Sequence, residues 1–73
     1  MEKRIKYELF KFGKRLRQLR KNKNLTQVDL ELLCSINNGD ISRIENGQKN
    51  IEFITIVKLA AALEVELFEL FKP

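Results

Sequence analysis

The sequence predicts an all-α fold, a compact bundle of five short helices in a single domain over residues 1–73. Apolar residues recur at three- and four-residue steps, no stretch alternates strictly between apolar and polar residues, and the only proline is Pro73. Such steps place apolar side chains on one face of a helix, whereas a half-buried strand needs a period of two. A chain of 73 residues is too short to build two separate cores.

The first helix is expected at about residues 7–22. Its apolar face is formed by Leu9, Phe12, Leu16 and Leu19. The sequence Asn22-Lys23-Asn24 ends this helix, because asparagine tolerates the left-handed conformation that follows many helices.

Two short helices with clear cap residues follow. Thr26 is the expected N-cap of a helix at about 27–34, since its hydroxyl can accept a hydrogen bond from the amide of Asp29. Asn37 is the expected cap of a helix at about 38–45, which Gly47 closes by adopting a positive φ.

The last two predicted helices lie in the C-terminal third of the chain. A fourth helix starts at Asn50 or Glu52 and ends near Leu63, and a short fifth helix covers about residues 66–71. Links of two to five residues between such helices are typical of a helical bundle.

The composition excludes several classes of function. The chain has no histidine and one cysteine, Cys34, so it lacks an internal disulfide, the usual zinc ligand sets and any histidine-based catalysis. No phosphate-cradling glycine loop or catalytic pair is present, so we expect no enzyme and no cofactor. No apolar run could span a membrane and no signal-peptide region precedes the domain, so a cytoplasmic protein without membrane contact is expected.

The charge is divided unevenly along the chain. The net charge is +4, with ten basic and two acidic residues in 1–25 against four basic and eight acidic residues in 26–73. A basic region beside an acidic one favours a polyanion on one side, although a charged helix face is as often simply solvated.

Several segments, in order and at matching spacing, resemble the helix-turn-helix proteins of the phage-repressor-like (XRE) family. The resemblance covers roughly residues 9–71, and its central part is Leu25-Thr26-Gln27-Val28-Asp29-Leu30, then Ile36, then Ile41-Ser42-Arg43-Ile44-Glu45-Asn46-Gly47. It implies a lambda-repressor-like DNA-binding domain whose motif covers about 26–46, with dimerisation helices at about 52–71. Two short helices joined by a tight turn can present the second one to the major groove of DNA.

The resemblance also assigns roles to individual residues. The third predicted helix would read bases in double-stranded DNA through Asn37, Asn38, Gly39, Asp40, Ser42 and Arg43. Contacts with the DNA backbone would come from Gln27, Gln48, Lys49, Asn50, Lys14 and Arg17. The guanidinium of Arg43 suits a guanine edge, while Asp40 either accepts a hydrogen bond from cytosine or turns away from the phosphates. The candidate base-reading residues also have plainer interpretations. Asn37 could be a helix cap only, and Arg43 a solvated surface charge.

Other positions are interpreted as structural or depart from the family pattern. The resemblance implies that Arg20 and Glu45 form a pair, which would fix the angle between the first and third helices, and that Cys34 is a buried thiol. Glu31 replaces the usual alanine and must reach solvent or a cation. Ser35 and Glu64 replace glycines, which predicts mild strain at positive φ.

A second surface is predicted to join two copies of the chain. Ile54, Val57, Ala61 and Phe68 are apolar where the family often has polar groups, and their spacing suggests one continuous patch. A twofold dimer through this patch would read half-sites about one DNA turn, roughly 34 Å, apart. The alternative is that these residues pack on the N-terminal segment, whose Ile5, Tyr7 and Phe10 also need cover.

The expected function is a sequence-specific transcriptional regulator that binds a pseudo-palindromic operator as a homodimer. Regulation would come through occupancy, by blocking RNA polymerase or by touching it from an adjacent site. The protein would be nucleoid-associated in a bacterium, or encoded by a phage or plasmid. Among small family members the chain resembles the controller proteins of restriction–modification systems, although phage or plasmid repressors and antitoxins are equally small. The alternative from another class is an antitoxin-like protein-interaction module in which DNA binding is secondary.

Overall fold

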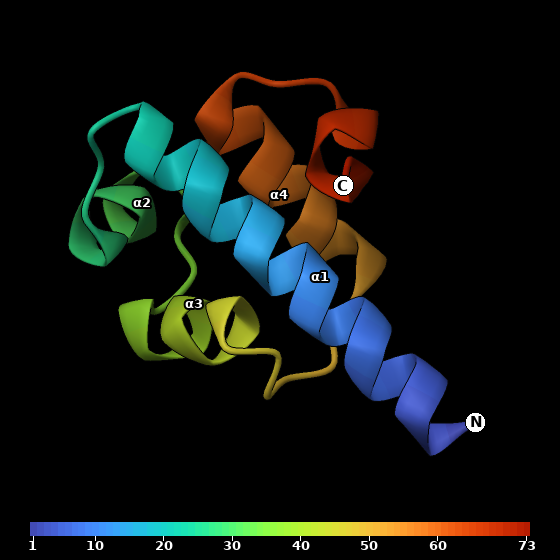
Figure 1. Ribbon diagram of the computed structural model, residues 1–73. Helices are drawn as coiled ribbons and strands as arrows, with labels where there is room; N and C mark the ends of the chain where they lie inside the picture. The colour runs from blue at the N-terminus through green and yellow to red at the C-terminus, as the bar shows by residue number, and fades with distance from the viewer.

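Four α-helices and one final 3-10 helix make up the fold, and the computed structural model describes the whole chain, residues 1–73 (Figure 1). In chain order these elements are α1 (Glu2–Asn22), α2 (Gln27–Cys34), α3 (Asn38–Glu45), α4 (Phe53–Leu63) and η1 (Leu67–Phe71). The predicted all-α class is confirmed. The predicted count of five α-helices is wrong, because the last segment is a short 3-10 helix and not an α-helix.

The first helix is longer than the sequence predicts. α1 begins at Glu2, five residues before the expected start at Tyr7. Its first turns carry an Arg4–Glu8 ion pair of 2.8 Å and a Lys11–Glu8 pair of 3.5 Å, at spacings that support an exposed helix. The helix ends before Asn24, which adopts the left-handed conformation with φ 58°.

The caps of α2 and α3 form as predicted. The Thr26 hydroxyl accepts a hydrogen bond from the Asp29 amide at 3.0 Å, and the Asp29 carboxylate accepts one from the Thr26 amide at 2.9 Å. This reciprocal pair satisfies two amides at the start of α2. At α3, the Asn37 side-chain oxygen accepts from the Gly39 amide at 2.7 Å.

The core lies where all five elements meet. α1 packs against α3 and η1, while α2 packs against α3 and α4. Seven large side chains are almost completely buried between these elements: Leu16, Leu30, Ile41, Ile44, Leu59, Leu63 and Leu70. Packing of these apolar faces, more than local propensity, holds such short helices in place.

One polar contact fastens η1 to α1. Arg15 Nε donates to the Glu69 carbonyl at 2.7 Å, and Arg15 Nη2 donates to the Glu69 carboxylate at 3.0 Å. Hydrogen bonds from Lys72, with a smaller share from Arg15, lower the pKa of Glu69.

None of the helices combines the length and the apolar character needed to cross a bilayer.

Candidate nucleic-acid interface

A buried ion pair fixes α3 against α1. Arg20 Nε and Nη2 donate to the two carboxylate oxygens of Glu45 at 2.7 and 2.9 Å, and both side chains are at least nine-tenths buried. Arg20 Nη1 also donates to the Leu25 carbonyl at 2.7 Å. The hydrogen bonds with Glu45 raise the pKa of Arg20. A bidentate pair with these added bonds sets both the distance and the angle between two helices.

A close backbone contact lies beside this pair. A Cβ atom built on Gly13 of α1 would lie 2.5 Å from the Glu45 carbonyl oxygen and closer still to that of Ile44. Only a residue without a side chain lets α1 approach the end of α3 so closely. Sequence analysis did not predict this contact, because the contact depends on where α3 docks.

The start of α3 is held by a residue that departs from the family pattern. Glu31 Oε1 accepts hydrogen bonds from the Asn38 backbone amide at 2.9 Å and from Asn38 Nδ2 at 2.6 Å. The carboxylate therefore partners a free amide at the positive end of the α3 dipole, where an anion is favoured. Glu31 also orients Asn38, a role that sequence analysis missed because the residues lie seven positions apart on different helices.

The exposed side of α3 carries a small charge network. The Asp40 carboxylate accepts a hydrogen bond from Arg43 and lies 4.0 Å from Lys49 Nζ. The Arg43 side chain is 55% exposed. Asn38 is exposed, while Gly39, Asp40 and Ser42 are half-buried. All of the predicted base-reading residues are thus at least partly exposed on the side of α3 away from the core, with Asn37 also serving as the cap.

The predicted backbone-contacting residues fall into three places. Gln48, Lys49 and Asn50 form the connection after α3, directly beside the charge network. Gln27, at the start of α2, donates from Nε2 to Glu45 at 3.2 Å and so joins the buried pair. Lys14 and Arg17 are exposed on α1, on a different helix from the rest, and Lys14 Nζ lies 5.3 Å from the centre of the Phe10 ring.

The two non-glycine residues expected to be strained are in the left-handed region. Ser35 follows α2 with φ 61°, and Glu64 follows α4 with φ 56°. Both positions end a helix, where this conformation lets the backbone turn sharply. A side chain costs energy in this conformation, so the turns are retained by packing of the helices they join.

The apolar patch predicted on the C-terminal helices is open to solvent. Ile54, Val57 and Phe68 are 68%, 44% and 60% exposed. The alternative in which the N-terminal segment covers them is wrong. Ile5 instead lines a separate groove with Ile51 and Ile56.

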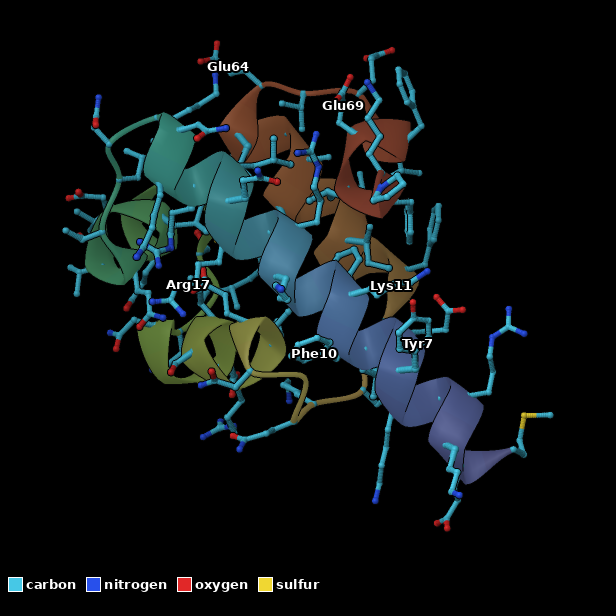
Figure 2. The ribbon with its side chains drawn as sticks, viewed as in Figure 1. Tyr7, Phe10, Lys11, Arg17, Glu64 and Glu69 are labelled. Atoms are coloured by element: carbon cyan, nitrogen blue, oxygen red, sulfur yellow. The ribbon has the colours of Figure 1, made fainter.

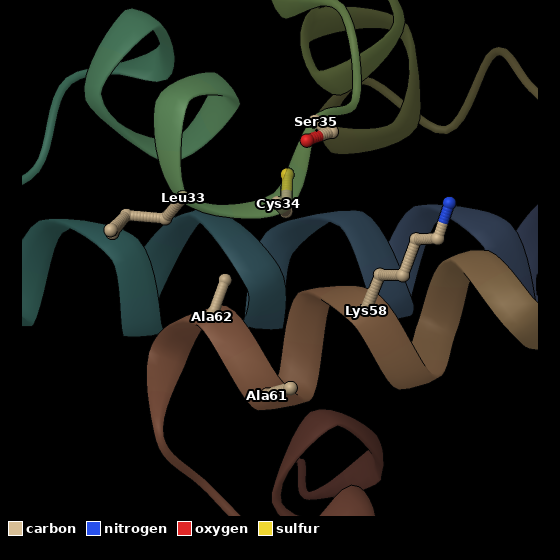
Figure 3. A pocket seen from close by; sticks show the side chains of 6 residues that line it. All are labelled: Leu33, Cys34, Ser35, Lys58, Ala61 and Ala62. Carbon is tan, nitrogen blue, oxygen red and sulfur yellow. The ribbon is translucent and has the colours of Figure 1, made fainter.

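A shallow groove of about 350 Å³ borders this patch at Ala61 (Figure 3). It lies between the end of α2 and α4, and it is lined by Leu33, Cys34, Ser35, Lys58, Ala61 and Ala62. Cys34 is a buried free thiol.

Comparison with known proteins assigns the family. The helix-turn-helix family model matches residues 16–70. Control protein C.MunI of a Mycoplasma species is 36% identical over 62 residues, covering 84% of each chain. Control protein C.BamHI of Bacillus amyloliquefaciens is 38% identical over 56 residues, covering 75% of this chain and 69% of that protein.

A solved structure agrees with these sequence matches. The restriction–modification controller protein C.AhdI from Aeromonas hydrophila is 43% identical and superposes with a TM-score of 0.87, covering 89% of this chain and 98% of that one. The chain belongs to the helix-turn-helix family of DNA-binding transcriptional regulators, which includes the controller proteins of restriction–modification systems.

Proposed function

We propose that this protein is a transcriptional regulator that binds a pseudo-palindromic operator as a homodimer and controls a restriction–modification system. The observation that carries the proposal is the rigid presentation of α3. Its inner face is fixed by the buried Arg20–Glu45 pair, while Asn37, Asn38 and Arg43 are exposed on its outer side. A helix presented in this way fits the major groove of B-DNA. The similarity to controller proteins supports the assignment to a restriction–modification system.

In this proposal Arg43 is the main base-reading residue. Its guanidinium can donate two parallel hydrogen bonds to the O6 and N7 atoms of guanine. In the free protein its charge is paired with Asp40. Asp40 therefore orients the Arg43 side chain before DNA binds. The ion pair must open or reorient when a guanine replaces the carboxylate as the partner of Arg43.

The neighbouring polar side chains complete the reading edge. Asn38 has one donor bound to Glu31, which leaves its amide oxygen to accept from an adenine or cytosine amino group. Asn37, whose oxygen caps α3, keeps its amide donor for DNA. Ser42 bonds a base or a phosphate, and Gly39 leaves room for the close approach of a base edge.

The flanking residues would bind the sugar–phosphate backbone. On one side of α3, phosphates would be bound by Gln48, Lys49 and Asn50. On the other side, they would be bound by Gln27 and the start of α2. Lys14 and Arg17 extend the basic track along α1. Several such contacts make affinity fall steeply with salt, because each releases counterions from the DNA.

We assign the patch of Ile54, Val57, Ala61 and Phe68 to the dimer interface. An exposed apolar patch on so small a protein marks an interaction site more often than not. A second copy with the same patch would bury it symmetrically and place two α3 helices on one face of the DNA, roughly 34 Å apart. The bound dimer then acts on RNA polymerase through occupancy, by blocking it or by contacting it from a neighbouring site.

Selection from a random duplex pool at physiological salt, followed by sequencing, tests this proposal. The expected product is a twofold-symmetric site whose half-sites are centred about one helical turn apart. Retention of DNA without an enriched sequence would contradict the proposal, and it would favour the protein-interaction alternative in which DNA binding is secondary.

A further inference from the structure

We propose that the first three turns of α1 form an additional DNA-contact surface, through which Lys3 and Lys6 bind phosphates flanking the part of the operator that α3 reads. This inference rests on the proposed function and extends it. The surface is a stripe along α1 formed by Lys3, Lys6, Phe10 and Lys14, called here the N-terminal stripe.

The spacing of these residues puts them on one face of α1. They are separated by three, four and four residues within one uninterrupted helix, so their side chains follow each other along one side. The same steps continue to Arg17. At a rise of 1.5 Å per residue, Lys3 lies about 16 Å further along the helix axis than Lys14.

The fold shows that this face borders the proposed reading surface. Lys6, Gly13 and Arg20 are spaced by seven residues, about two helical turns, and so lie on nearly one line along α1. Gly13 and Arg20 both contact the end of α3. Lys6 therefore lies on the α3 side of α1, two turns beyond the point where α3 ends.

The connection after α3 confirms this placement. A Cβ atom built on Gly47 would lie 3.1 Å from the Phe10 Cα atom, so the loop that carries Gln48 and Lys49 passes directly beside the stripe. Figure 2 shows Phe10 and Arg17 on the side of α1 towards α3, with Lys11 on the other side. In Figure 1 the start of α1 extends past this loop, away from the body of the molecule.

The cations of the stripe form no ion pair, unlike those on the adjacent face of the helix. Lys3, Lys6 and Lys14 form no ion pair, and Glu2, one turn before Lys6, does not pair with it. Arg4 and Lys11, by contrast, are both paired with Glu8, whose pKa is lowered chiefly by the hydrogen bond from Arg4. Unpaired cations that continue a proposed phosphate-binding loop fit a polyanion, and duplex DNA already lies at that loop in the proposed complex.

Two double variants of equal charge test the inference. Lys3→Ala/Lys6→Ala removes two cations from the stripe, while Arg4→Ala/Lys11→Ala removes the two cations that pair with Glu8 on the adjacent face of α1. Affinity for a selected site is measured by fluorescence anisotropy between 50 and 300 mM salt, with circular dichroism as the check that both variants fold. Hydroxyl-radical footprints are recorded for each protein.

The expected result is a difference between the two sides of α1. The stripe variant should lower the slope of log K against log salt by about 0.9 for each lost contact, or about 1.8 for each protomer, and shorten the footprint at its outer edges. The Arg4→Ala/Lys11→Ala variant should keep the wild-type slope and the wild-type footprint. Each variant should select the same sequence as the wild type, because phosphate contacts do not read bases.

Equal slopes and equal footprints for the two double variants would overturn the inference. If the stripe variant loses affinity for an acidic protein partner but not for DNA, the surface belongs to that partner and the inference is also wrong. Failure of the proposed function is a separate result. A wild type that selects no sequence still permits the slope comparison on random duplex.

Discussion

At the scale of single residues, three positions set how α3 is presented. Gly13 allows the backbones of α1 and α3 to touch, and Arg20 and Glu45 lock the two helices at that contact. None of the three needs to touch DNA. In the proposed complex their effect on DNA binding is indirect, because α3 can read bases only when its angle and depth are fixed.

Gly13→Ala is expected to destabilise the protein by about 1–3 kcal/mol, the usual cost of overpacking. Alanine favours a helix over glycine by about 1 kcal/mol, so local propensity alone predicts the opposite sign. The new Cβ meets rigid carbonyl groups and must push α3 away. Urea denaturation measures the change, with Asn22→Ala as the control on an exposed α1 site. An unchanged or higher stability would show that α1 and α3 do not approach so closely.

Arg20→Ala is expected to lower the free energy of unfolding by about 3–5 kcal/mol, because it leaves the Glu45 carboxylate buried without its partner. The double variant Arg20→Leu/Glu45→Leu should be clearly more stable than the single one, since it removes both charges. Thermal melts of the three proteins give the comparison. Equal losses for the single and double variants would contradict the buried-charge account.

The sequence predicted some of these residues and missed others for a physical reason. Thr26 and Asn37 were predictable as caps, because a cap is decided within about three residues of chain. The contacts of Gly13 with α3 and of Glu31 with Asn38 depend on how two helices dock. No local sequence pattern determines this docking. The Arg20–Glu45 pair was predicted from the family resemblance and not from the spacing of the two residues.

At the scale of elements, the helix boundaries follow from caps and terminal residues. α2, α3 and α4 begin and end within a few residues of the predicted positions, because Thr26, Asn37, Gly47 and the turn residues mark them locally. The start of α1 was predicted too late. Its first turns carry one apolar residue that lies on the inner face, Ile5, and ion pairs with Glu8 support the exposed side, whereas the predicted apolar face was traced only from Leu9.

The cap of α2 makes stability depend on pH. Hydrogen bonds from the backbone and side chain of Thr26 lower the pKa of Asp29 in the folded protein. The ionised carboxylate therefore stabilises the fold above the ordinary aspartate pKa of about 4, and this contribution is lost as the pH falls below that value. Asp29→Asn should lower the melting temperature at pH 7, and the gap to the wild type should shrink towards pH 3. A gap of constant size would contradict the role of the charge.

At the scale of the whole molecule, the basic helix and the proposed dimer patch lie on different elements, and α1 also exposes Ile5, Tyr7 and Phe10. Most of the positive charge belongs to α1, while the exposed apolar residues Ile54, Val57 and Phe68 belong to α4 and η1. In the proposed complex, one protomer would use the side formed by α1 and α3 for DNA and the side formed by α4 and η1 for a second copy. The bundle class was predictable from periodicity, but the relative placement of the two surfaces required the docked helices.

Phe68→Glu is expected to convert the dimer to a monomer while leaving the fold intact, because the side chain is largely exposed within one protomer. Sedimentation velocity measures the oligomeric state. Tyr7→Glu, at another exposed aromatic on α1, is the matched control and should remain a dimer. A Phe68→Glu protein that sediments as a dimer would exclude this interface.

The most direct test of the central claim, that α3 reads DNA through Arg43, is the ratio of affinities for a selected site and a scrambled duplex. Arg43→Ala should reduce this ratio at a cost of about 1–3 kcal/mol for each half-site. Arg17→Ala, which removes a proposed phosphate contact, should weaken binding to both duplexes alike and keep the ratio. If Arg43→Ala leaves the ratio unchanged, α3 does not read the sequence through this residue and the account of the interface is wrong.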